Sequence, residues 1–152
     1  MPTSLREQAL AAFEARLLTL TGAGLIDRNI TYEVATAEMP AIIQFDGSDR
    51  NLKLQSGRAD IETDVSVLVM ARATLGTDIG PAVNDWAAKV RAVIGSYRTL
   101  GGLPGVEDIE WRGSNGPILV GEEDAPPFAS MIVQFSIMRF ESEGDPYALP
   151  WV

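Results

Sequence analysis

The side chains best suited to chemistry in this 152-residue chain are carboxylates. Asp60, Glu62 and Asp64 occur at every second position, so in a β-strand all three point to one side. Oxygen ligands of this kind suit Mg²⁺ or Ca²⁺, although a site also needs further ligands and a cavity. A solvated strand face explains the spacing more simply, and we expect no metal site.

Two further acidic clusters lie at residues 107–110 and 122–124. A carboxylate pair can hydrolyse glycosides when one acid is kept protonated and the other ionised. Neither cluster sits in a sequence context that pairs a buried acid with a solvated one. We interpret both as solvated acidic faces, and a carboxylate hydrolase is left as a minor alternative.

The residues and motifs on which other kinds of catalysis depend are missing from this sequence. The chain has neither histidine nor cysteine, which removes the usual neutral-pH base and thiolate nucleophile. No serine lies in a Gly-x-Ser-x-Gly elbow, and Gly22-Ala23-Gly24 follows a helical pattern instead of the strand that a phosphate loop requires. We expect no catalytic residue, no cofactor and no enzyme activity.

The charge balance is acidic and uneven. Twelve Lys and Arg oppose 21 Asp and Glu, giving a net charge of −9. Residues 101–152 hold only two of the cations but nine of the acids. Such a surface repels nucleic acid, whose binding depends on Lys and Arg. Solubility is the simplest role for the excess charge.

No segment suggests a membrane or export. Residues 1–7 lack the basic and apolar regions of a signal peptide, which predicts synthesis and folding in a cytoplasm. The longest uncharged run, Ala125–Met138, has 14 residues and two prolines, short of the roughly 18 needed for a span.

Two helices are predicted from apolar spacing. Ser4 and Glu7 form a capping-box pattern that starts a helix over about 4–21, ending near Gly22. The second covers about 81–98, and Gly101–Gly105 stops it. We expect Trp86 and Trp111 to be core anchors.

Strands are predicted around these helices. Residues 23–39 are an edge strand or extended loop, and residues 39–47 are a strand. Residues 48–58 are expected to be an exposed hairpin or loop. The alternating stretch 61–73 predicts a long strand. Further strands are predicted over 106–112, extended by 117–120, and over 130–141, with a loop at 122–127.

This order predicts one α+β domain over residues 1–152, with an antiparallel or mixed sheet and two main helices on one face. Strands of about eleven to thirteen residues would span roughly 36–43 Å. A compact domain of this length has a radius of gyration of only about 15 Å. The strands therefore either extend toward neighbouring subunits or bend within one subunit.

The order of elements resembles the tail-terminator (tail-completion) proteins of long-tailed bacteriophages and related gene-transfer particles. The N-terminal helix is followed by Asp27-Arg28-Asn29-Ile30 and by the Met39–Gly47 strand. The Ile61–Arg72 strand, the Trp86 helix and the Met131–Phe140 strand complete the pattern, with Glu143–Tyr147 after them. The resemblance covers about residues 5–147, although residues 101–127 match no named feature.

The resemblance implies a structural virion protein of the head-proximal end of the tail, assembled in the host cytoplasm. Such proteins form a hexameric ring that stops polymerisation of the tail tube and meets the head-side connector. The implied partners are other copies of the chain, the tube protein and the connector. DNA passes through the ring as cargo that must not stick, and no membrane, catalysis or cofactor is involved.

We assign candidate residues to this role. Candidate contacts with a neighbouring subunit or the tube are Asp46, Asp49, Arg50, Lys53, Arg58, Arg72, Arg139, Tyr147 and Trp151. Candidate acids lining the DNA channel are Glu107, Asp108, Glu110, Glu122, Glu123 and Asp124. We further expect residues 45–58 to be a flexible polar excursion that becomes ordered against a partner.

Two alternatives to the tail terminator are open. One is a neck or head-completion protein with a similar fold and ring, which would assemble with heads. The other is a small adaptor or binding domain unconnected with virions, which predicts a monomer or dimer and a well-formed apolar pocket.

Overall fold

A computed structural model describes residues 2–55, 57–72, 78–122 and 125–150. This part of the chain contains two α-helices, a short 3₁₀ helix and five strands, and the five strands form one mixed sheet. The helices are α1 (Leu5–Leu17) and α2 (Ile79–Gly95), and η1 is Thr36–Glu38. The strands are β1 (Leu25–Arg28), β2 (Ala41–Gln55), β3 (Arg58–Arg72), β4 (Val106–Glu122) and β5 (Ala125–Ser142).

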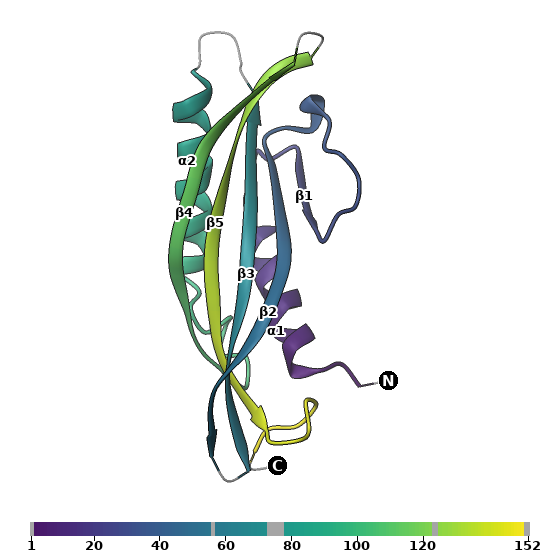
Figure 1. The fold of residues 1–152 in the computed structure, drawn as a ribbon, viewed down its shortest axis with the longest axis vertical. Helices are drawn as coiled ribbons and strands as arrows, with labels where there is room; N and C mark the ends of the chain where they lie inside the picture. The colour runs from purple at the N-terminus through teal and green to yellow at the C-terminus, as the bar shows by residue number, and fades with distance from the viewer. Residues whose placement is uncertain (1, 56, 73–77, 123–124, 151–152) are drawn as a thin grey trace.

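The strands lie in the order β1-β2-β3-β5-β4, so β1 and β4 are the two edges of the sheet. Only the β1–β2 pair is parallel. The 18 residues of β5 can span up to roughly 60 Å. Figure 1 shows the result: an elongated molecule in which the β2–β3 hairpin extends past both helices at one end, while α2 begins near the end of the β4–β5 hairpin at the other.

Both helices cover the same face of the sheet. In β3 the side chains of Val65, Val67 and Val69 point toward them and are at most 1% exposed. Val133, Phe135 and Ile137 of β5 add to the core on the same side. The alternation along residues 61–71 therefore predicts this core face correctly. The predicted fold class, α+β with one sheet and two helices on one of its faces, is also confirmed.

α1 starts where the sequence indicates. The Glu7 amide donates to Ser4 Oγ at 3.1 Å, so Ser4 caps the helix. The carboxylate of Glu7 does not complete the capping box but accepts two hydrogen bonds from Arg28. The helix ends at Leu17, earlier than predicted, because the Thr19 and Leu20 amides donate to carbonyls three residues back and tighten the chain into a turn.

Several strands are longer than predicted. We expected residues 48–55 in an exposed hairpin or loop. They form the outer half of β2 and pair with β3, and the last pair is Gln55 with Arg58. Of the two alternatives, the hairpin is therefore correct, with register shifts between Asp46 and Asp49 and between Asn51 and Lys53. The predicted loop is wrong at residues 125–127, which belong to β5. Ala125 pairs with Glu122, and the two prolines lie beside the register shift between Val120 and Glu122, at the end of a hairpin arm where proline is tolerated.

A bulge in β2 changes the direction of the outer half of this strand. The register shifts between Asp46 and Asp49, and a Cβ on Gly47 would lie 2.6 Å from the Asp64 carbonyl oxygen. Only glycine fits so close an approach. The bulge brings Asp49 next to Arg6 of α1.

Neither α1 nor α2 covers the second face of the sheet. The connection between β1 and β2 covers one end of it, where Met39, Ala41 and Met70 form a small cluster with Val34 and Leu68 packed against them. The remainder of this face consists of side chains of the sheet alone, and we call it the open face.

Candidate interaction surfaces

A polar layer joins α1 to the sheet and contains three of the candidate contact residues, Asp46, Asp49 and Arg139. Asp46 accepts hydrogen bonds from Arg28 at 2.7 Å, Asn29 at 2.8 Å and Gln44 at 3.1 Å. Burial alone would raise the pKa of the Asp46 carboxyl, but these three donors outweigh it and hold the pKa below its ordinary value of 3.8. Asp46 is thus committed to contacts within the protomer.

This layer predicts a specific loss of stability in acid. Because the pKa of folded Asp46 lies below that of the unfolded chain, its contribution is complete above about pH 4 and is lost as the pH falls through the folded pKa. We expect Asp46→Asn to lower the free energy of unfolding by about 2 kcal/mol at pH 7. The difference from the unmutated protein should shrink below about pH 4.

Urea unfolding between pH 7 and pH 3 measures this difference. Asp85→Asn is the control, because Asp85 forms an exposed pair with Lys89 within α2. A difference for Asp46→Asn that stays constant down to pH 3 would contradict the assignment.

A second part of the layer is buried at the β2–β3–β5 junction. Arg139 is 4% exposed and donates to Thr63 Oγ1 at 2.8 Å, Asp49 Oδ2 at 3.0 Å and Glu141 Oε2 at 2.8 Å. Asp49 also accepts from Arg6 at 2.7 Å. Arg139 and Asp49 already form an ion pair with each other inside the protomer. We therefore do not assign either residue to a contact with another subunit or with the tube.

The open face carries an ionic belt that runs across several strands. Glu62 of β3 is only 3% exposed, although no helix covers it. Arg50 of β2 reaches it from one side, and Arg112 of β4 donates to it at 2.6 Å from the other. Burial would raise the pKa of Glu62, but hydrogen bonds from Arg50, Ser136 and Arg112 hold it below its ordinary value. The belt fixes Arg50 within the protomer, yet leaves its side chain 65% exposed.

The β2–β3 hairpin end carries two more candidate contacts. Arg58 pairs with Asp60 at 2.8 Å and with Glu107, and its guanidinium lies 4.1 Å from the Phe140 ring centre. Lys53 is exposed, and no described carboxylate forms an ion pair with it. Leu52 beside it is 47% exposed. The tip therefore presents an apolar and a basic side chain beyond the helices.

The remaining candidate contacts are scattered. Arg72 is exposed at the end of β3, opposite the hairpin tip along the strand. Tyr147 is 50% exposed in the turn after β5. Trp151 lies outside the described residues. The structure thus brings Asp46, Asp49 and Arg139 close to α1, and leaves Lys53, Arg72 and Tyr147 apart on the surface.

Each candidate channel acid that is described has an arginine partner. Glu107 pairs with Arg58, Asp108 pairs with Arg98 at 2.7 Å, and Glu110 pairs with Arg112 at 3.0 Å. Glu122 belongs to β4, but its side chain, and the residues Glu123 and Asp124, lie outside the description. The start of β4 is therefore closer to neutral than its sequence suggests, and its place in a channel remains a prediction.

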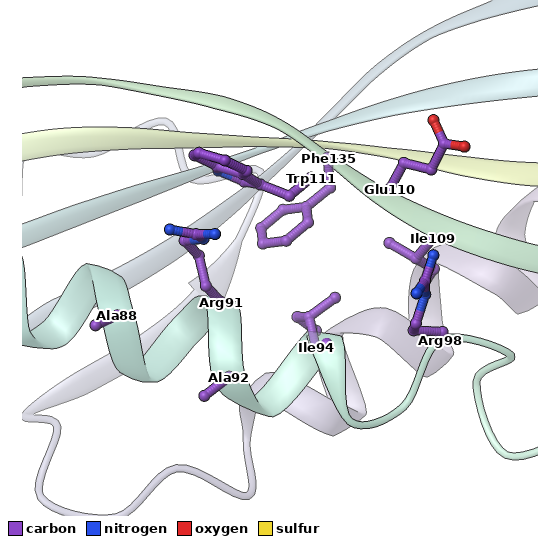
Figure 2. A pocket seen from close by; sticks show the side chains of 10 residues that line it. Ala88, Arg91, Ala92, Ile94, Arg98, Ile109, Glu110, Trp111 and Phe135 are labelled. Carbon is purple, nitrogen blue, oxygen red and sulfur yellow. The ribbon is translucent and has the colours of Figure 1, made fainter.

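A groove of about 670 Å³ lies between α2 and β4, as Figure 2 shows. Trp111 is 46% exposed in it, so its predicted role as a core anchor is wrong. The cause is position: β4 is an edge strand, and α2 covers only part of the ring. Arg91 of α2 lies over the Trp111 ring, with 3.6 Å from the guanidinium carbon to the ring centre.

Sequence reasoning missed this groove, although a signal existed. Trp111 alternates with Ile109 on the core side of a predicted strand, and Arg91 is on the helix that must pack there. Trp86, the other expected anchor, is partly buried and does pack against the core.

The described residues hold no group of three or more carboxylates arranged to bind a metal ion. Within the same residues, neither α1 nor α2 has the length and apolar character to cross a membrane. No protein-family model matches the chain, and no curated protein matches it.

Proposed function

We propose that this protein is a structural component of a phage tail. In this proposal six copies form a ring at the head-proximal end of the tail tube, where the ring stops tube polymerisation and provides the surface that joins the head connector. The proposal rests on the resemblance in the order of elements. The observation that best supports it is the elongated sheet, whose β2–β3 hairpin extends beyond both helices.

The two ends of the elongated subunit differ from each other, and so do the two edges of its sheet. Such a subunit suits a ring that binds a different partner on each side. A ring closes when one surface of a subunit binds a different surface of the next. Contacts made by the flanks of the sheet leave the two hairpin ends free for the tube on one side and the connector on the other. Lys53, Leu52 and Arg58 at the β2–β3 end and Tyr147 nearby are candidates for one of these contacts.

DNA enters this account as passing cargo. The net charge of −9 disfavours binding to a phosphate backbone. Because the acids at the start of β4 are paired with arginines, the repulsion must come from the summed charge of six subunits more than from these acids alone.

Sedimentation and electron microscopy of the purified protein test the proposal. We expect a species near six times 16.4 kDa, about 98 kDa, either alone or after mixing with tail tubes encoded by the same genome. Micrographs of the mixture should show one ring at one end of each tube. A protein that stays monomeric in the presence of tubes would contradict the proposal.

The same experiment separates the alternatives. A neck or head-completion protein would bind DNA-filled heads and leave tubes bare. An adaptor domain unconnected with virions would bind neither and remain a monomer or dimer.

A further inference from the structure

The groove between α2 and β4 displays a cation that forms no ion pair with the described residues. Lys89 and Arg98 beside it pair with Asp85 and Asp108. Arg91 is exposed, and no described carboxylate forms an ion pair with it. Stacking on Trp111 holds its guanidinium in place at the mouth of the groove (Figure 2). A fixed, unpaired guanidinium beside a half-exposed indole is typical of a protein contact.

The opposite flank of the molecule has the complementary character. β1 lies at the opposite edge of the sheet from β4 (Figure 1), and the connection from β1 through η1 continues this flank over one end of the second face. Glu33 and Glu38 in this connection are exposed, and no described cation forms an ion pair with either. Tyr32 beside them is 50% exposed, and its hydroxyl donates to Asp27 at 2.7 Å.

The two flanks differ in the charges that form no ion pair within the described residues. On the α2–β4 flank, Lys89, Arg98 and Arg112 pair with Asp85, Asp108 and Glu110, which leaves the guanidinium of Arg91. On the β1–η1 flank, the guanidinium of Arg28 is already used by Glu7 and Asp46, which leaves the carboxylates of Glu33 and Glu38. The charges available for a contact are therefore of opposite sign on the two flanks.

We infer that the α2–β4 groove of one copy binds the β1–η1 flank of a second copy, with Arg91 facing Glu33 and Glu38. This contact joins unlike surfaces on opposite edges of the sheet, so it repeats from copy to copy and can close into a ring. Tyr32 and Trp111 supply aromatic area in the same contact, and the charges fix its direction. The inference rests on the proposed ring and identifies the surface through which its subunits meet.

Charge reversal tests the contact. Arg91→Glu and the double variant Glu33→Lys/Glu38→Lys each place like charges across the interface, and we expect each to weaken ring formation at least tenfold. Mixing the two variants should restore rings in which they alternate, because every groove then meets a flank of opposite charge. Native mass spectrometry after labelling one variant measures the alternation, with tail tubes present if the unmutated ring needs them.

A control variant and the mixture itself guard against unfolding as the cause. Glu143→Lys reverses an exposed charge in the turn after β5, outside the candidate contacts, and should assemble normally. Restoration by mixing requires that both interface variants are folded.

Each outcome is decisive. If Arg91→Glu and Glu33→Lys/Glu38→Lys form rings as well as the unmutated protein, or if mixing restores nothing, the contact is wrong while the proposed function stands. If the groove binds a small anion or another protein instead, the variants leave the rings intact. If the unmutated protein forms no ring with or without tubes, the proposed function and this inference both fail.

Discussion

Phe13→Ala is expected to lower the free energy of unfolding by about 3–5 kcal/mol. Phe13 is fully buried at the centre of α1, and its ring meets that of Phe135 edge-on, with 5.5 Å between ring centres. Truncation removes the transfer energy of the ring, leaves a cavity under α1, and loses an aromatic pair worth about 0.5–1.5 kcal/mol. For a domain of this size the midpoint of thermal unfolding should fall by roughly 10 °C.

Chemical and thermal unfolding of the two proteins measure this effect. Leu18→Ala is the matched control, because Leu18 follows the same helix but is 56% exposed. Its loss should stay within about 0.5 kcal/mol. Equal losses for the two variants would mean that α1 does not pack on the sheet as described.

Arg139→Met is the second large effect that we expect, at about 3–5 kcal/mol. Methionine replaces the aliphatic part of the arginine side chain but carries no charge, so Asp49 and Glu141 lose a buried cation and Thr63 loses a donor. Asp49 keeps Arg6 and Glu141 is partly exposed, which favours the lower end of the range. The loss should come from the charges left without a partner more than from packing.

Arg98→Met is the control for Arg139→Met, because it removes the same charge from an exposed ion pair instead of a buried one. Arg98 binds Asp108 through two hydrogen bonds of 2.7 Å, yet its side chain is 57% exposed. A surface pair contributes about 0–1 kcal/mol and weakens with salt. If both variants lose the same small amount, the polar layer at Arg139 is solvated and does not hold β2, β3 and β5 together.

Much of the fold could be predicted because its signals are local. The period of two along residues 61–71 follows from one face being packed and the other not. The start of α1 follows from the Ser4 hydroxyl, which needs only the amide three residues on. The predicted end of α1 near Gly22 was less accurate, because the helix ends at Leu17. The turn after Leu17 is made by backbone hydrogen bonds, which require no particular residue type.

The rest depends on partners distant in sequence. Glu62 looks like a solvated residue in its strand, but Arg50 and Arg112 approach it from two other strands and bury it. Arg139 lies 90 residues from Asp49, so its use inside the protomer could not be read from either segment. The half-exposed position of Trp111 depends on β4 being an edge, which the strand order determines and the strand's own sequence does not.

Tail length in particles assembled without this protein tests the central claim most directly. If the ring terminates the tube, cells that lack the gene should accumulate tubes of widely varying length together with tailless heads, and supplying the gene in trans should restore one length. Tails of normal, uniform length that join heads in its absence would contradict the account.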